Sequence, residues 1–484
     1  MSLGAVLVVG NWIESPSAEE KLDLPLARFE FLGQSALELT IKHLRAAQVN
    51  DISVVIQDHC SASLSGLRGP NLRVKVVKRS IDPSVVEAIL RQQAAQGMGT
   101  LMLMRLGAYV EADFADLLDF HREMGRPLTR AYDCDGLLDL WVLDAGLRHA
   151  LNIDSLLKDN LIRSSYGVDG YVNRLAGMKD FRRLVSDSFM GFSTIRPRGR
   201  EVRPGVWVGD GAHVHRSARV VAPAYIGEGT RIRESVLLTR GSNVERQCEI
   251  SSGTAVESAS ILPRTFLGRG LAVTKALVDG DSYVHLGRNL AVKIEDKRLI
   301  GRTTVSGWPF IRNANSGHHE FRRNGRNQLR DWGSRGQTLD LIEGAGMTTR
   351  RPVIIQELPE RLTRGEVRPF LLEVKDHLDG DRPRLVFDFS RVCQIDSSGI
   401  EALLYCMEEV MKRDGDLKLA AVPAKQLMIL ELTRVDRLFE TFETASEAVE
   451  SFHHFPIRSR RHKQQPWYSQ TGNDETAEGF KMAV

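Results

Sequence analysis

The sequence predicts a multidomain α/β protein made of three folded parts in tandem. Strand-like and helix-like segments alternate over residues 1–200, which favours a largely parallel sheet covered on both faces by helices. An aliphatic residue then recurs at every sixth position of residues 201–300, and this period predicts a parallel β-helix. A second alternation of strands and helices fills residues 350–455 and indicates a smaller α/β domain.

Length and composition are those of a cytoplasmic globular protein. The 484 residues suffice for about three domains, and the net charge of +3 indicates no particular class of partner. The apolar start, residues 3–9, predicts a buried strand, and no apolar run is long enough to cross a membrane. The five cysteines lack the spacing of a zinc site or a disulfide frame, which favours reduced thiols: Cys60, Cys134, Cys248, Cys393 and Cys406.

Residues 1–200 contain recognisable elements at intervals. Helical spacing of apolar residues predicts helices over 36–47 and 114–121. Apolar or β-branched runs predict strands over 5–9, 52–56, 101–104 and 137–143.

The six-residue period is the strongest signal in the chain. A small residue mostly stands four places after each aliphatic, which fits a triangular coil with one inward side chain on each side. Ten such positions make about three coils: Val208, Val214, Val220, Ile226, Ile232, Leu238, Val244, Ile250, Val256 and Leu262. This pattern resembles the left-handed parallel β-helix of the hexapeptide-repeat superfamily.

The order of strand, helix, strand and then β-helix resembles sugar-nucleotide pyrophosphorylases over residues 1 to about 300. The resemblance lies in the organisation and only weakly in the motifs. It implies a Rossmann-like nucleotidyltransferase-type domain over residues 1–200, and it leaves a bound sugar nucleotide open as a possibility.

The positions that would carry the chemistry of that family are changed. The Gly-rich phosphate loop is replaced by Val9-Gly10-Asn11-Trp12-Ile13-Glu14, and Leu24-Pro25-Leu26-Ala27 lacks the lysine of the Pro-Lys-Pro segment. The two metal-binding aspartates of the family map onto Ala108 and Arg174. Because phosphoryl transfer depends on positioned cations and metal, we expect a pseudoenzyme without catalytic residues, metal or cofactor. The alternative is an active sugar-1-phosphate nucleotidyltransferase with Asp113 or Asp169 as displaced metal ligands.

Two histidines raise a different enzymatic possibility. Hexapeptide-repeat proteins are often acyltransferases with a histidine base, and His213 and His215 lie in the first coil. Both flank the inward Val214 and are expected to point outward, which favours ordinary surface residues.

Residues 350–455 centre on the turn Asp396-Ser397-Ser398-Gly399, placed between a strand and a helix. Predicted strands cover 353–355, 384–389 and 417–422, and predicted helices cover 364–378, the residues after 399, and 424–432. This order resembles the STAS, or anti-sigma-factor-antagonist, domain.

The resemblance implies that Ser397 is phosphorylated by an anti-sigma-factor-like serine kinase or another switch protein, with Asp396, Ser398 and Gly399 as its neighbours. A serine at a helix start is expected to be an N-cap, and a phosphate there adds about −1.5 to −2 charge. That charge beside Asp396 would repel an acidic partner. The alternative is that Ser397 and Ser398 only cap the helix.

Residues 301–349 form an Arg-rich linker, and the polar tail over 456–484 is expected to be disordered. The favoured hypothesis is a regulator, in which a phosphorylation-controlled STAS switch stands on an oligomerising, non-catalytic scaffold. The competing hypothesis is a nucleotidyltransferase or acyltransferase regulated by its STAS domain. Nucleic-acid binding through the linker arginines is the least favoured.

Overall fold

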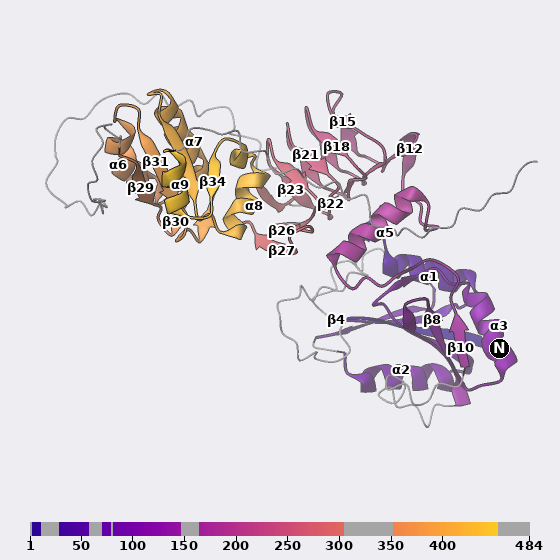
Figure 1. Cartoon of the computed structure of the whole chain (residues 1–484). Helices are drawn as coiled ribbons and strands as arrows, with labels where there is room; N and C mark the ends of the chain where they lie inside the picture. The colour runs from indigo at the N-terminus through magenta and orange to yellow at the C-terminus, as the bar shows by residue number, and fades with distance from the viewer. Residues whose placement is uncertain are drawn as a thin grey trace, which may run out of the picture.

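The structure is a computed structural model that describes residues 2–10, 29–57, 70–78, 81–146, 164–303 and 352–453. It contains an N-terminal domain (residues 2–195), a coil (residues 200–303) and a C-terminal domain (residues 352–453), with the coil between the other two (Figure 1). Residues 11–14 of the altered phosphate loop, residues 304–349 of the predicted linker and the predicted tail lie outside the described residues.

A seven-stranded sheet in the order β10-β8-β9-β6-β1-β4-β5 forms the N-terminal domain. The strands β6, β1, β4 and β5 are parallel, as the alternating pattern predicts. Strand β9 runs antiparallel to both β6 and β8, because only two residues separate β8 from β9 and such a short loop joins antiparallel strands. The bounds are β1 Ser2–Val9, β4 Asp51–Gln57, β5 Leu72–Val77, β6 Met98–Arg105, β8 Leu128–Asp133, β9 Gly136–Asp144 and β10 Ser164–Gly167.

Helices cover both faces of this sheet. Alternate residues of β1 point to opposite faces, so Leu7 packs in the cluster on the side of α1 while Val6 and Val8 pack on the side of α2. Figure 1 shows α1 and α2 on opposite faces of the sheet. The helices are α1 Ala36–Ala46, α2 Pro83–Ala95, α3 Phe114–Met124 and α5 Met178–Met190, and short strands are β2 Glu30–Phe31, β3 Gln34–Ser35, β7 Tyr109–Val110 and β11 Val172–Asn173.

The coil shows the predicted repeat in its strand pairing. Each short strand pairs in parallel with the third strand after it, so that Ile226 lies beside Val244, 18 residues on. Three sheets result, and their inward aliphatic side chains form one buried cluster. The strands are β13 Val206–Val208, β14 His213–Val214, β15 Arg219–Val220, β16 Ala224–Ile226, β17 Arg231–Ile232, β18 Leu237–Thr239, β19 Asn243–Val244, β20 Glu249–Ile250, β21 Ala255–Glu257, β22 Ser260–Ile261, β23 Thr265–Leu267, β24 Ala272–Thr274 and β25 Ala276–Asp279.

The coil departs from the predicted period at its tenth position. Val244 pairs with Ile261, because this coil is one residue shorter than the one before it. Ile261 therefore fills the interior, and the prediction that Leu262 points inward is wrong: Leu262 packs in the cluster of the N-terminal domain. The repeat also continues past residue 262, through the buried Leu267 and Val273, so it extends beyond the ten predicted positions while staying within the predicted range of residues 201–300.

Antiparallel strands flank the parallel ones. At the end of the coil, β26 (Ser282–His285) and β27 (Leu290–Lys293) extend the sheet of β25, and β28 (Ile300–Arg302) pairs with β23. At its start, β12 (Arg200–Arg203) pairs with β13.

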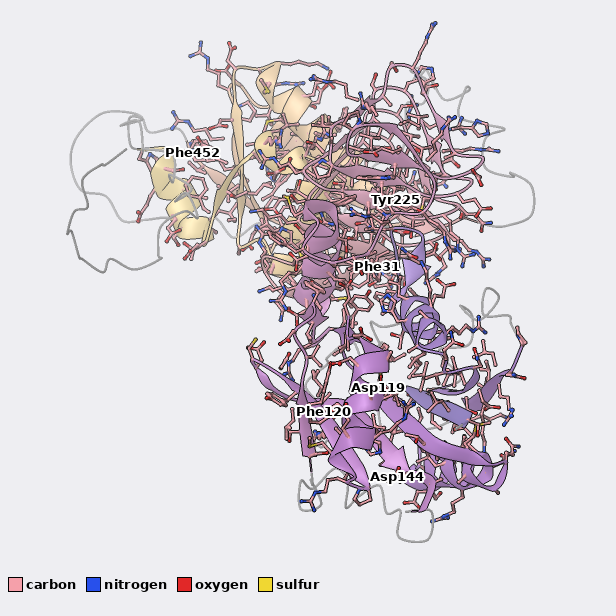
Figure 2. The ribbon with its side chains drawn as sticks, turned by 90° about the vertical axis from the view of Figure 1, so that its right-hand side faces the viewer. Phe31, Asp119, Phe120, Asp144, Tyr225 and Phe452 are labelled. Atoms are coloured by element: carbon pink, nitrogen blue, oxygen red, sulfur yellow. The ribbon has the colours of Figure 1, made fainter. Side chains whose placement is uncertain are left out.

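The N-terminal domain packs on the side of the coil. Phe31 and Tyr225 belong to one buried cluster that spans the two parts, and both are labelled near the contact in Figure 2. In the turn after β2, the N–H groups of Leu32 and Gly33 donate to the buried carboxylate of Glu245 at 2.8 and 3.0 Å. The two parts therefore share both a hydrophobic cluster and a buried polar contact.

The C-terminal domain is a parallel sheet in the order β29-β31-β33-β34. Leu385 and Phe387 face the cluster that contains α6, α7 and α8, whereas Val386 faces α9 on the opposite side. A second small ladder joins β30 to β32. The elements are β29 Ile354–Glu357, β30 Arg361–Leu362, α6 Val367–Leu378, β31 Arg384–Asp388, β32 Gln394–Ile395, α7 Ser397–Met411, β33 Asp416–Ala420, α8 Ala424–Leu432, β34 Glu440–Phe442 and α9 Ala445–Ser451.

Helix α8 of the C-terminal domain lies between the rest of that domain and the end of the coil. It packs on β32 of its own domain and on β24 and β27 of the coil. Five of its nine residues are buried, and the coil interior continues into the C-terminal core as one hydrophobic cluster. The C-terminal domain therefore closes the end of the coil that lies beyond β24.

Candidate functional site

The turn Asp396-Ser397-Ser398-Gly399 joins β32 to α7. Asp396 has an extended backbone (φ −116°, ψ −179°), and its carboxylate accepts a hydrogen bond of 2.9 Å from the N–H of Gly399. Asp396 is therefore the N-cap of α7. The prediction that Ser397 caps the helix is wrong, because Ser397 is already the first helical residue and the carboxylate before it takes the free N–H.

Two further contacts fix the position of this turn. The second carboxylate oxygen of Asp396 accepts a hydrogen bond of 3.1 Å from the N–H of Arg364, in the loop before α6. Gly399 is buried so close to β30 that a Cβ atom there would lie 2.1 Å from the carbonyl oxygen of Leu362. Asp396 and Gly399 thus hold the start of α7 against the neighbouring loop, and the two serines between them share that fixed position.

Ser397 forms its hydrogen bonds outside its own domain. Its N–H donates to Oδ2 of Asp296 at 2.9 Å, and its hydroxyl donates to the same oxygen. Asp296 belongs to the coil segment between β27 and β28, and its side chain is only 9 % exposed. Free N–H groups at a helix start favour a carboxylate in this position. The coil therefore supplies the anion that lies at the start of α7.

Ser398 lies next to a cation. The guanidinium of Arg298 donates to the Ser398 hydroxyl at 3.3 Å and forms an ion pair of 3.1 Å with Asp296. Burial alone would raise the pKa of Asp296, but the hydrogen bonds from Arg298 and Ser397 lower it to about 2. Asp296 is consequently charged at neutral pH. Two adjacent serines thus contact groups of opposite charge.

Sequence reasoning missed the residues that complete this site. Asp296 and Arg298 are separated from the serines by about one hundred positions, and they follow the repeat without belonging to it. Glu295 of the same segment accepts a hydrogen bond from the side chain of Gln394, next to the turn. One indication of this segment was present in the sequence: the six-residue aliphatic period stops before the charged residues 295–298.

The positions that map onto metal-binding aspartates lie together in the N-terminal domain. Strand β7 pairs with β11 so that Tyr109 lies beside Asn173, which makes Ala108 and Arg174 the next residues along that ladder. The guanidinium of Arg174 forms an ion pair with the buried Asp133 and donates to the carbonyl oxygen of Leu137 at 3.2 Å. An internal ion pair therefore occupies the place where the resemblance would put a metal ligand.

The two alternative metal ligands have different surroundings. Asp113 is the N-cap of α3 and accepts hydrogen bonds from the N–H groups of Ala115 and Asp116 at 3.0 and 3.1 Å. Asp169 is exposed. Within the described ranges, no three His, Cys, Asp or Glu side chains gather as a group able to hold a metal ion.

The coil histidines lie on the surface of the first coil. His213 is exposed, and Nδ1 of His215 hydrogen-bonds to the hydroxyl of Ser217 at 2.8 Å. The nearest ion-pair partner of His215 is Glu234, at 4.0 Å. The contact with Ser217 is local, and the contact with Glu234 reaches the neighbouring coil.

Comparison with known proteins bears on the C-terminal domain. No helix in the parts of the chain that the structure describes is long and apolar enough to cross a membrane. No curated protein matches the chain significantly. The family model of the STAS domain matches residues 346–448, which include the four-stranded sheet, its first three helices and the Asp396–Gly399 turn. The C-terminal domain is therefore a STAS domain.

Proposed function

We propose that this chain is a cytoplasmic regulatory protein whose STAS domain binds a partner under the control of Ser397 phosphorylation. The partner is an anti-sigma-factor-like serine kinase or another switch protein. One observation carries the proposal: in a matched STAS domain, Ser397 is the first residue of α7 and its hydroxyl contacts a group outside the domain. A side chain in this position can respond to charge without any change inside the STAS core.

The N-terminal domain and the coil serve as a non-catalytic scaffold in this proposal. The scaffold is a degenerate nucleotidyltransferase-like domain followed by a left-handed β-helix. Support comes from Arg174, which pairs with Asp133 next to Ala108. Because the metal carboxylates are replaced, we expect no magnesium-dependent release of pyrophosphate with any common pair of nucleotide and sugar 1-phosphate. Robust turnover would favour the alternative, an active sugar-1-phosphate nucleotidyltransferase.

A cavity between the N-terminal domain and the coil lends little support to a bound sugar nucleotide. Its volume is about 160 Å³, and Glu30, Arg198 and Arg246 are among its lining residues. Typical small-molecule pockets enclose about 300–1,000 Å³. The cavity is therefore small for a nucleotide with an attached sugar.

The proposal includes a homo-oligomer formed through the coil. The STAS domain covers one end of the coil, while β14 and β15 at the other end each pair with a strand on one side only. Val214 and Val221 are exposed there, at 40 % and 41 %. Open strand edges with apolar side chains favour association. Light scattering of the full chain at micromolar concentration tests this, and a monodisperse monomer would remove the oligomer from the proposal.

The switch is tested by partner capture with the full chain. Ser397→Asp adds one negative charge where phosphate would add nearly two, so we expect a partial loss of the partner. Ser397→Ala removes only the hydroxyl, since Asp396 caps the helix, and it should retain the partner. Ser398→Asp is the control, with the same charge one residue further along.

The captured partner is identified, and its affinity is measured against each purified variant. Equal affinity for wild type and Ser397→Asp would mean that Ser397 does not control binding.

A further inference from the structure

The face of the STAS domain that carries Ser397 is covered by the coil of the same chain. Asp296 contacts Ser397, Glu295 contacts Gln394, and α8 packs on β24 and β27. Ser397 itself is only partly exposed. A second protein cannot reach its hydroxyl in the way a kinase must while Asp296 occupies that position.

We infer that this covered face is the partner-binding surface of the STAS domain, and that the coil is an internal competitor whose contact with Ser397, like that of the partner, is weakened by phosphorylation of Ser397. The inference rests on the proposed switch function and adds the regulation of that site. The unmodified protein exchanges between a docked form and an open form, and the partner binds the open form. Docking therefore weakens the apparent affinity for the partner, because only the open fraction of the molecules can bind it.

Charge explains why a phosphate on Ser397 favours the open form. The phosphate would stand where the hydroxyl now contacts Oδ2 of Asp296, and that carboxylate is itself charged. An isolated helix start tolerates an anion, but here a resident anion already holds the place. Two like charges in contact repel, so the phosphate disfavours the docked form.

Ser398 should give the opposite response. Its hydroxyl contacts the guanidinium of Arg298, which lies in the same coil segment as Asp296. A phosphate on Ser398 would therefore gain a charge-assisted hydrogen bond to the coil. Ser397 contacts a negatively charged group and Ser398 contacts a positively charged one. The position of a single phosphate therefore decides whether the STAS domain releases or retains the coil.

The chemistry of α8 indicates which kind of partner fits the open surface. The buried residues Met428, Ile429, Leu430 and Leu432 cover more than one side of the helix, because it lies between the STAS core and the coil. Release of the coil would expose an apolar face of this helix, which also packs on β32, the strand that leads into the serine turn. The partner is therefore a protein with an apolar surface beside its serine-binding site.

The inference is tested on the full chain without any partner. Three forms are compared: unmodified, with phosphoserine incorporated at position 397, and with phosphoserine at position 398. Amide hydrogen exchange reports docking through α8 and β27, and it reports STAS folding through β31 and β33. We expect phosphoserine 397 to speed exchange in α8 and β27 about tenfold or more, with β31 and β33 unchanged. Phosphoserine 398 should leave exchange at the unmodified level or slow it.

Asp296→Asn supplies the matched control, because it removes the charge and keeps an acceptor oxygen. Combined with phosphoserine 397, it should restore most of the protection of α8. Unchanged exchange with phosphoserine 397 would overturn the inference, as would equal loosening by phosphoserine 398 or loss of protection in β31 and β33. Since no partner is present, failure here leaves the proposed switch standing. Conversely, phosphoserine 397 could release the coil while no partner binds the unmodified and phosphorylated forms with different affinity. That result would contradict the proposed switch and leave the inference about the coil standing.

Discussion

Arg288 and Glu431 form a two-point ion pair between the coil and α8, with both N···O distances at 2.6 Å. Arg288 lies in the turn between β26 and β27, and Glu431 lies in the last turn of α8. Their side chains are 39 % and 33 % exposed, so water screens the pair and its contribution is about 1 kcal/mol. Neither residue belongs to the serine turn or to the segment of Asp296 and Arg298, so the pair can test docking without replacing Ser397 or its partners.

Reversing one charge of this pair should loosen the STAS domain from the coil. In Arg288→Glu, two carboxylates would face each other, and we expect exchange of α8 amides to rise about fivefold. Glu431→Arg should act in the same direction. The double variant restores an attractive pair and should return exchange close to the wild-type level. If the double variant is as loose as either single variant, the ion pair does not contribute to docking.

Gly399→Ala should destabilise the STAS domain although alanine favours helices. The new Cβ would lie 2.1 Å from the carbonyl oxygen of Leu362, a backbone atom that cannot rotate away. Overpacking against backbone should cost about 3 kcal/mol or more in the free energy of unfolding. Gly365→Ala is the matched control in the same domain, because nothing lies within 4 Å of its new Cβ. Equal denaturation midpoints for the two variants would contradict this account of the turn.

Much of the STAS domain could be predicted from the sequence. The helix predicted over 424–432 is α8, and the turn at residues 396–399 lies between a strand and a helix as expected. The spacing of apolar residues predicts helices and strands well when all of them bury their apolar faces in a single hydrophobic core. Strand β34 and helix α9 were missed, because both are short and carry few apolar residues.

The first two parts show where periodicity stops being informative. Helix α2 was missed although Asp82 and Pro83 give an N-cap and a first-turn proline. Leu262 was assigned to the interior because the period continues through it, whereas a coil shortened by one residue turns it outward. A repeat pattern cannot reveal such a slip when two aliphatic residues stand side by side.

The contact between Ser397 and Asp296 could not be predicted at all. The two residues are 101 positions apart and belong to different parts of the chain. Sequence patterns indicate which side chains share a core, but not which polar surfaces meet after folding. The prediction of Ser397 as the N-cap failed by one residue for a local reason, since Asp396 and Ser397 are both good capping residues.

Arg174 should be a structural residue, and Arg174→Leu should destabilise the N-terminal domain. Its loss would leave the Asp133 carboxylate, only 6 % exposed, without its ion-pair partner. The arginine is itself 34 % exposed, so water screens the pair, and leaving the buried carboxylate without this partner should cost about 1–3 kcal/mol. The control is Arg183→Leu, because Arg183 lies 3.6 Å from Asp180 and is 57 % exposed. Chemical denaturation monitored by hydrogen exchange of β8 and β9 should separate the two, and equal effects would contradict a structural role for Arg174.

The buried carboxylate of Glu245 should make the contact between the N-terminal domain and the coil sensitive to pH. Burial is the main cause that raises its pKa to about 8, and the nearby charge of Glu30 adds to it. Hydrogen bonds from Asn243 and from the turn after β2 oppose the shift without cancelling it. The folded protein thus keeps a proton that the unfolded chain releases near pH 4.5.

Stability should therefore fall as pH rises from about 4.5 to about 8, by at most about 1.4 kcal/mol for each pH unit, and level off above that range. Glu245→Gln has no charge to bury, so its thermal unfolding should depend less on pH between 5 and 8 than that of wild type. Glu249→Gln is the matched control, since Glu249 lies on the next strand of the coil and pairs with Arg233 at 2.8 Å. Calorimetry of the full chain at several pH values provides the measurement. A wild-type slope of the opposite sign, or the same slope in Glu245→Gln, would mean that Glu245 is charged in the folded protein and that its three N–H donors outweigh burial.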